Sequence, residues 1–320
     1  MRDVLSTATA MAMATAAATT IATTTPATVR ARGIRTATPP RERIVWLAVA
    51  EGRGHLMRAQ LAARLLEPAG IDVEIVTTSQ AGVTFMAEFG LPASVVSTSY
   101  RLLYDGQQNL ARLRTHAMAV TYLVSPRRCL RDLAWLEGRA AGAALIVNDS
   151  FHPALLAASL VGRDLADRVV HVHGENTRRA VEASVGRGPI RAMVRRALTR
   201  STRIEITLGD RPPSSSAIHL PPLLPMPRPR DAVRAELGVR AGQRLAVVYL
   251  NPYFHDAALA DVIESELAAG GYHLHAVGEG FADRPGWRAR DAALGEAVAA
   301  ADVFVSAAGV GALALARASE

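Results

Sequence analysis

The stretch that decides the fold is residues 44–66, IVWLAVAEGRGHLMRAQLAARLL. It opens with a run of seven apolar residues, which is typical of a strand buried on both faces of a parallel sheet. From His55 onward, leucine and alanine recur at helical spacing, with Arg58 and other polar residues between them. The change of period within residues 51–54 predicts a strand, a glycine-bearing loop and an amphipathic helix.

The loop carries two glycines, Gly52 and Gly54, followed directly by His55. Glycine tolerates positive φ and lets another molecule approach the backbone, and the N–H groups at a helix start attract anions. The loop is expected at the carboxyl end of its strand, where ligands of open α/β folds bind. Imidazole titrates near neutral pH, so His55 is the candidate proton-transfer residue. A structural turn with a capping histidine is the alternative interpretation.

Composition narrows the class of protein. A chain of 320 residues has room for two domains, and its alternating strand and helix patterns indicate α/β architecture. All 36 basic residues are arginines and the formal net charge is +7, but no basic motif interleaved with aromatic residues indicates a nucleic-acid partner. The single cysteine, Cys129, excludes an internal disulfide and a cysteine-cluster metal site, and fits a cytoplasmic protein. No apolar run reaches the ~20 residues that span a bilayer.

The chain divides by composition into four parts. Residues 1–41 form an Ala/Thr-rich tract with few large apolar residues, interpreted as a disordered extension. Residues 42–220 read as a first βα domain, and the proline-rich residues 221–230 as an extended linker. Residues 231–320 repeat the βα pattern and carry a second glycine loop. Two such domains predict a ligand cleft between them.

Polar residues follow two further predicted strands of the first domain. Asp149 comes after the strand at residues 143–147, and Glu175 after the strand at residues 168–173. The carboxyl ends of parallel strands share one edge of a sheet, so both residues are expected on the acceptor side of the site, near the glycine loop. His171 and His173, in an alternating strand, are interpreted first as structural histidines, with His173 a secondary candidate for acceptor contact.

A long helical stretch is predicted over residues 100–138, with Leu113 on its apolar face and arginines at polar positions. The first interpretation of these arginines is a solvated helix face. The second is peripheral contact with an anionic membrane surface.

Several short motifs, in this order and spacing, resemble the GT-B superfamily of glycosyltransferases, particularly the MurG-like, family 28-like branch. They are Gly52-Arg53-Gly54-His55, Pro221-Pro222, Leu237-Gly238, Val277-Gly278 and the run at residues 301–311, ADVFVSAAGVG. The resemblance covers about residues 43–320 and implies two Rossmann-like βα domains facing a cleft. Chains of that family continue past the position of Glu320, so the C-terminal domain is expected to be partial.

The resemblance also implies roles for particular residues. His55 would act as the base on the acceptor hydroxyl, and the acceptor would lie by Gly52, Gly54, Asp149 and Glu175. Gly278 and Glu279 would border the nucleoside of the donor. Backbone N–H groups would face the donor diphosphate along Ala308, Gly309, Val310 and Gly311. A helix terminus would neutralise the leaving diphosphate, so no metal and no cofactor is expected.

The function implied is inverting, metal-independent transfer of a sugar from a UDP- or dTDP-sugar to an acceptor hydroxyl. Two alternatives stay open. The first is a nucleotide-sugar hydrolase, because Gly54-His55-Leu56-Met57-Arg58 also resembles the first loop of GT-B-shaped hydrolases. The second is a non-catalytic protein that binds a nucleotide sugar or assists a partner glycosyltransferase. The expected location is the cytoplasm. The alternative is peripheral attachment to the inner face of the membrane. The sequence identifies neither the sugar, nor the acceptor, nor the oligomeric state.

Overall fold

The computed structural model describes residues 41–51, 53–97, 101, 103, 111–123, 125–149, 152–161, 164–174, 195–199, 201–208, 217–226, 228–252, 254–307 and 309–319. These residues form two compact units. Unit 1 contains the described residues up to Leu223 except Leu208, and unit 2 contains Leu208 and the described residues from Leu224 onward.

Unit 1 is built on a seven-stranded sheet in the order β3-β2-β1-β4-β5-β6-β7, with every neighbouring pair parallel. The order places β1 beside β2 on one side and β4 on the other, so the chain reverses direction across the sheet there. The strands are β1 (Glu42–Ala48), β2 (Ile71–Thr77), β3 (Ala93–Val95), β4 (Leu145–Asp149), β5 (Val169–Gly174), β6 (Thr202–Ile206) and β7 (Ile218–Leu220).

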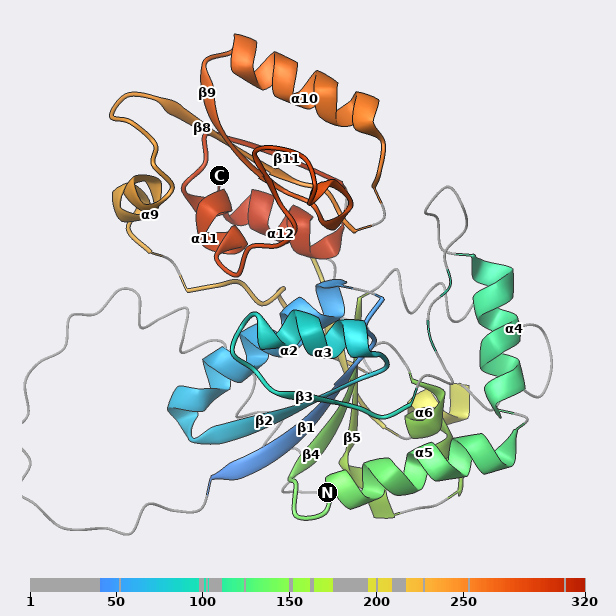
Figure 1. Cartoon of the computed structure of the whole chain (residues 1–320). Helices are drawn as coiled ribbons and strands as arrows, with labels where there is room; N and C mark the ends of the chain where they lie inside the picture. The colour runs from blue at the N-terminus through green and yellow to red at the C-terminus, as the bar shows by residue number, and fades with distance from the viewer. Residues whose placement is uncertain are drawn as a thin grey trace, which may run out of the picture. The chain divides into compact units, whose positions relative to one another are not determined.

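Helices cover both faces of this sheet (Figure 1). The helices are α2 (Arg53–Leu66), α3 (Gln80–Ala87), α4 (Arg112–Leu123), α5 (Pro126–Arg139) and α6 (Pro153–Val161), with short 3-10 turns at Glu67–Ala69 and Asp164–Arg168. The described residues 195–199 are also helical. Alternate residues of β1 divide between the two faces. Trp46 packs with α2 and α3, whereas Val45 and Leu47 pack with α5 and α6. The continuous apolar run in β1 is explained by burial on both sides.

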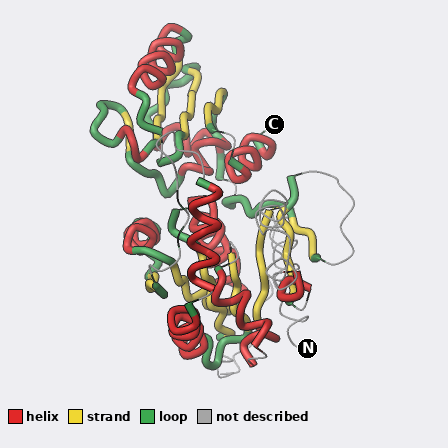
Figure 2. Tube along the Cα trace, turned by 90° about the vertical axis from the view of Figure 1, so that its right-hand side faces the viewer, coloured by secondary structure: helices red, strands yellow, loops and turns green. Residues whose placement is uncertain are grey.

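Unit 2 has a four-stranded parallel sheet in the order β10-β9-β8-β11. Its strands are β8 (Arg244–Tyr249), β9 (Tyr272–Val277), β10 (Trp287–Arg288) and β11 (Val303–Ser306), and its helices are α9 (Arg230–Glu236), α10 (Ala257–Ala269), α11 (Leu294–Ala299) and α12 (Val310–Ala318), with a 3-10 turn at Glu279–Phe281. Figure 2 shows helices on either side of the strands. Two separate apolar clusters flank the sheet.

Some local predictions need correction. Gly54 lies in the first turn of α2 and is absent from the glycines with positive φ, so unusual backbone conformation does not explain a glycine there. Leu113, predicted on a packed face, is 86% exposed, and α4 instead buries Tyr122. Apolar residues at helical spacing predict a buried face, but a short helix such as α4 buries only a narrow stripe of its surface. Strands β7 and β10 were not predicted, because each has at most three residues.

Within the described part of the chain, no helix is both long and apolar enough to cross a membrane.

Gly280 offers a test of packing in unit 2. A Cβ atom at this position would lie 2.0 Å from the carbonyl oxygen of Phe254 and 2.6 Å from Nδ1 of His255. Gly280→Ala should therefore lower the free energy of unfolding by about 1–3 kcal/mol, measured by urea denaturation. Gly311→Ala is the matched control, because a Cβ there meets nothing within 4 Å and the residue is helical. Equal stability of the two variants would contradict the close approach.

Candidate functional site

Asp149 is the centre of the site in unit 1. It is the last residue of β4, pairs in register with Ala48 of β1 and Val172 of β5, and has no exposed surface. Its register places it on the face of the sheet that α2 covers, because Ala48 and Val172 belong to that core. A carboxylate at this position must be stabilised by groups that the protein supplies, since water does not reach it.

Among the described residues, the side chains of Trp46, His55 and Arg58 hydrogen-bond to this carboxylate. His55 Nδ1 lies 2.6 Å from Asp149 Oδ1, and an Arg58 Nη1–H donates to the same oxygen at 2.7 Å. Trp46 donates its Nε1–H to Asp149 Oδ2 at 3.3 Å. Both oxygens of a fully buried carboxylate are therefore engaged.

The two charged or titratable partners come from one face of α2. His55 and Arg58 are three residues apart, so they lie on neighbouring positions of the helix surface. The side chains are 19% and 15% exposed, respectively. The positive end of the helix dipole also lies at the first turn of α2, where it favours a nearby carboxylate.

The hydrogen bonds fix the tautomer of His55. An ionised carboxylate only accepts hydrogen bonds, so Nδ1 of a neutral His55 carries the hydrogen and donates it to Asp149. The lone pair is then on Nε2. A neutral imidazole held in this tautomer can accept a proton from a bound hydroxyl group or water molecule, which is the requirement for a general base.

The loop before α2 is held by contacts from neighbouring elements. The Ala50 N–H donates to Thr78 Oγ1 at 3.1 Å, and Thr78 Oγ1 donates to Glu51 Oε2 at 3.4 Å. Arg53 donates to the Ala50 carbonyl at 2.9 Å and stacks its guanidinium over the ring of Phe85. These contacts fix where α2 begins and therefore where His55 lies.

The other residues predicted for the acceptor side are Gly52, Gly54 and Glu175, with His173 as a secondary candidate. Gly52 and Glu175 lie outside the described residues. Gly54 is exposed in the first turn of α2, beside His55, with open space around its Cβ position. His171 and His173 have no exposed surface, and burial is the main cause that lowers the pKa of His171 to about 3, with His173 and Arg203 contributing. A neutral, buried His171 fits its structural interpretation.

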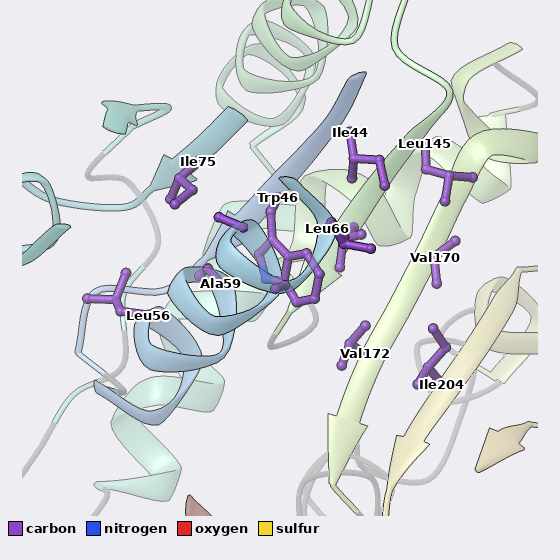
Figure 3. Close-up of a cluster of buried hydrophobic side chains, with 14 of the residues drawn as sticks. Ile44, Trp46, Leu56, Ala59, Leu66, Ile75, Leu145, Val170, Val172 and Ile204 are labelled. Carbon is purple, nitrogen blue, oxygen red and sulfur yellow. The ribbon is translucent and has the colours of Figure 1, made fainter. Parts of the chain in front are cut away.

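An apolar pocket adjoins Asp149 and the side chains that donate hydrogen bonds to it. Two of its lining residues, Trp46 and Arg58, are also donors to Asp149. The others are aliphatic residues of α2, the neighbouring strands and the segment after β7: Ala62, Leu65, Leu66, Val172, Ile204, Ile206, Leu220 and Leu223. Figure 3 shows Trp46, Leu66, Val172 and Ile204 gathered between α2 and the sheet.

The predicted diphosphate loop lies in unit 2, between β11 and α12. Gly309 is the N-cap of α12 with extended backbone, no side chain caps the helix, and Val310 and Gly311 form its first turn. Ala308 lies outside the described residues. Added Cβ atoms at Gly309 or Gly311 would meet nothing within 4 Å. An open, uncapped helix start can receive an anion.

Gly278 and Glu279 lie together at the carboxyl end of β9. The Gly278 N–H donates to the Arg288 carbonyl, and a Cβ on Gly278 would lie 3.1 Å from the ring of Phe281, so packing explains this glycine. Glu279 Oε2 accepts from Arg290 at 3.2 Å, and both side chains are about one-fifth exposed (20% and 21%). Among the described residues, no group of three or more His, Cys, Asp or Glu side chains is arranged to hold a metal ion.

Trp46 and Arg58 were missed by sequence reasoning. The sequence predicts Trp46 as a buried strand residue, and Arg58 as a polar position of α2 and the last residue of the motif at residues 54–58. It predicts a contact with Asp149 for neither of them. The signal for Arg58 was its spacing of three residues from His55, which puts both on one helix face. No local pattern reveals that Asp149, more than ninety positions away in the chain, lies against that face.

Comparison with solved structures relates this architecture to known proteins. No family model matches the chain, and no curated protein matches it. The calicheamicin glycosyltransferase CalG4 is similar at a TM-score of 0.51 and 17% identity, over 87% of this chain and 77% of that one. The glycosyltransferase SnogD from Streptomyces nogalater is similar at 0.50 and 19% identity, over 87% and 80%. MurG from Acinetobacter baumannii is similar at 0.39 and 15% identity, over 85% and 74%.

These similarities establish the class of fold. The chain is an α/β protein with two parallel-sheet units. More particularly, it has the GT-B fold of glycosyltransferases, as the motifs predicted.

Asp149 should be important for stability as well as for the site. Asp149→Ala leaves the partly buried Arg58 guanidinium without its partner, so we expect a loss of about 3–5 kcal/mol in the free energy of unfolding. Asp72→Ala breaks an ion pair with Arg41 whose side chains are about half exposed, and should cost less than about 1 kcal/mol. Similar losses in both variants, measured by denaturant titration, would contradict the buried-charge account.

Proposed function

We propose that the chain is a glycosyltransferase that moves a sugar from a nucleoside diphosphate sugar, UDP- or dTDP-linked, to an acceptor hydroxyl. The observation that carries the proposal is the His55–Asp149 pair at the start of α2, 2.6 Å apart. It supplies a histidine fixed in the tautomer that a base needs, at the carboxyl edge of a sheet in a GT-B fold. The fold alone does not define an activity, so the site carries the argument.

In the proposed reaction, His55 Nε2 takes the proton of the acceptor hydroxyl as its oxygen attacks the anomeric carbon of the donor. The bond from that carbon to the diphosphate oxygen breaks, and the diphosphate leaves with the electron pair. Attack from the side opposite the leaving group inverts the anomeric configuration. Asp149 stabilises the imidazolium that forms, since the two groups share a hydrogen bond.

The donor diphosphate is assigned to the N-terminus of α12. Gly309 leaves the helix start uncapped, and neither Gly309 nor Gly311 puts a side chain in the way of an approaching phosphate. Backbone N–H groups and the helix dipole would then offset the negative charge of the leaving group, and the proposed reaction needs no metal ion. Glu279 and Arg290 would lie by the nucleoside. The proposed location is the cytoplasm.

The first experiment is calorimetric titration of the folded chain with UDP, dTDP and other nucleoside diphosphates. Binding of one of them selects the sugars for an activity screen, in which NMR reads the anomeric configuration of the product. A transferase yields the inverted glycoside of the acceptor. Release of free sugar irrespective of acceptor would identify a hydrolase, which the same His55–Asp149 pair would serve by activating water. Absence of nucleotide binding would contradict the proposal.

His55→Gln should lower kcat by about 10²–10⁴-fold, the usual contribution of general-base catalysis. The Kd for the nucleoside diphosphate should stay within about threefold of wild type, because His55 is assigned to acceptor activation and not to the donor. His273→Gln, which changes a histidine of β9, serves as the control and should retain activity. Loss of nucleotide affinity in His55→Gln would refute the assignment of His55 as the base.

Gly311→Asp should weaken binding of the nucleoside diphosphate by about tenfold or more, because it adds a negative charge to the helix start that would receive the phosphates. Gly311→Asn has nearly the same shape without the charge and should weaken binding much less. Calorimetry measures both. Equal affinity of the aspartate and asparagine variants would count against a diphosphate site at α12.

A further inference from the structure

Arg58 shares one carboxylate oxygen with the candidate base. Its Nη1 atom lies 2.7 Å from Asp149 Oδ1, and Nδ1 of His55 lies 2.6 Å from that same atom. The two partners compete for the same negative charge inside unit 1, where the carboxylate has no contact with solvent. The charge balance around Asp149 therefore differs from that of a histidine and an aspartate alone.

A buried carboxylate with only a histidine beside it would favour the imidazolium form of that histidine. The positive charge would stabilise the carboxylate, and charge interactions are strong where water is excluded. A base that already carries a proton cannot accept another. The guanidinium of Arg58 supplies the compensating charge instead, so His55 can stay neutral while its Nδ1–H still donates to Asp149.

We propose that Arg58 is a positioning residue, which holds Asp149 Oδ1 in place and offsets its charge so that His55 stays neutral and available as a base. The proposal rests on the proposed function for its link to catalysis. The effect of Arg58 on the charge of His55 does not depend on that function and can be measured in ligand-free protein.

The other described groups near His55 do not take this role. Arg53, in the same helical turn, points to the Ala50 carbonyl and the ring of Phe85. Glu51, in the preceding loop, accepts from Thr78. Trp46 contacts the second oxygen of Asp149 and is uncharged. Among these side chains, Arg58 is the cation in direct contact with the carboxylate that His55 uses.

The direct test is an NMR titration of the histidine rings in ligand-free protein, with the His55 signals assigned by their loss in His55→Gln. In Arg58→Met, the titration midpoint of His55 should rise by about one pH unit or more relative to wild type. Arg58→Lys keeps the charge and should lie close to wild type. Arg64→Met removes an exposed arginine of the same helix and serves as the control.

A second comparison removes the buried carboxylate of Asp149, so it does not depend on Arg58→Met folding well. Asp149→Asn leaves His55 facing the Arg58 cation without the carboxylate, and adding Arg58→Met removes both charges. The midpoint of His55 should be higher in the double variant than in Asp149→Asn, because the cation has gone. Equal midpoints in this pair, or a shift in Arg58→Met no larger than in Arg64→Met, would overturn the proposal.

Once a substrate is known, the rate profile supplies the catalytic readout. The acidic limb of kcat/KM against pH should move to higher pH in Arg58→Met, with a roughly tenfold loss of rate per unit on that limb, and should return in Arg58→Lys. An NMR shift without any change in the rate profile would overturn the catalytic role of His55 while leaving the electrostatic role of Arg58 standing. A merely structural loss would lower the rate equally at all pH values.

Discussion

The buried carboxylate of Asp149 is the constraint on which the first unit depends. A charge without solvent contact is costly unless the protein surrounds it with donors, and here Trp46, His55 and Arg58 provide them. These donors belong to β1 and α2, which come first among the described elements of the unit. One carboxylate at the end of β4 therefore ties the middle of the sheet to the start of the helix beside it.

The contacts of Asp149 with His55 and Arg58 require that the loop between β1 and α2 be held in place. His55 lies in the first helical turn, so any shift of the helix start moves it relative to Asp149. Thr78 and Arg53 fix the loop from both sides through hydrogen bonds to Ala50. The same geometry that satisfies a buried charge also presents Nε2 of the histidine as a proton acceptor. Stability and the proposed chemistry share one set of contacts.

The start of α12 in unit 2 differs from the Asp149 site, because no described side chain caps the helix there. At α12 the helix start is left uncapped behind Gly309, with room around Gly309 and Gly311. A capping side chain would satisfy the backbone N–H groups and occupy the place of an anion. Side chains thus carry the site of unit 1, whereas the backbone carries the predicted phosphate site of unit 2.

The sequence by itself determined the elements. The sequence predicted β1, β4, β5 and the start of α2 to within about two residues, because the spacing of apolar residues and the positions of glycine are local properties. The motifs from Gly52 to Gly311 predicted the GT-B fold. The position of Asp149 after its strand predicted that it lies near the glycine loop. Only the tertiary structure decided that Trp46, His55 and Arg58 all contact its carboxylate, since the order of strands brings β4 against β1 and α2 lies across that junction. Contacts between residues 91 to 103 positions apart leave no periodic trace in the sequence, and they form only when the sheet does.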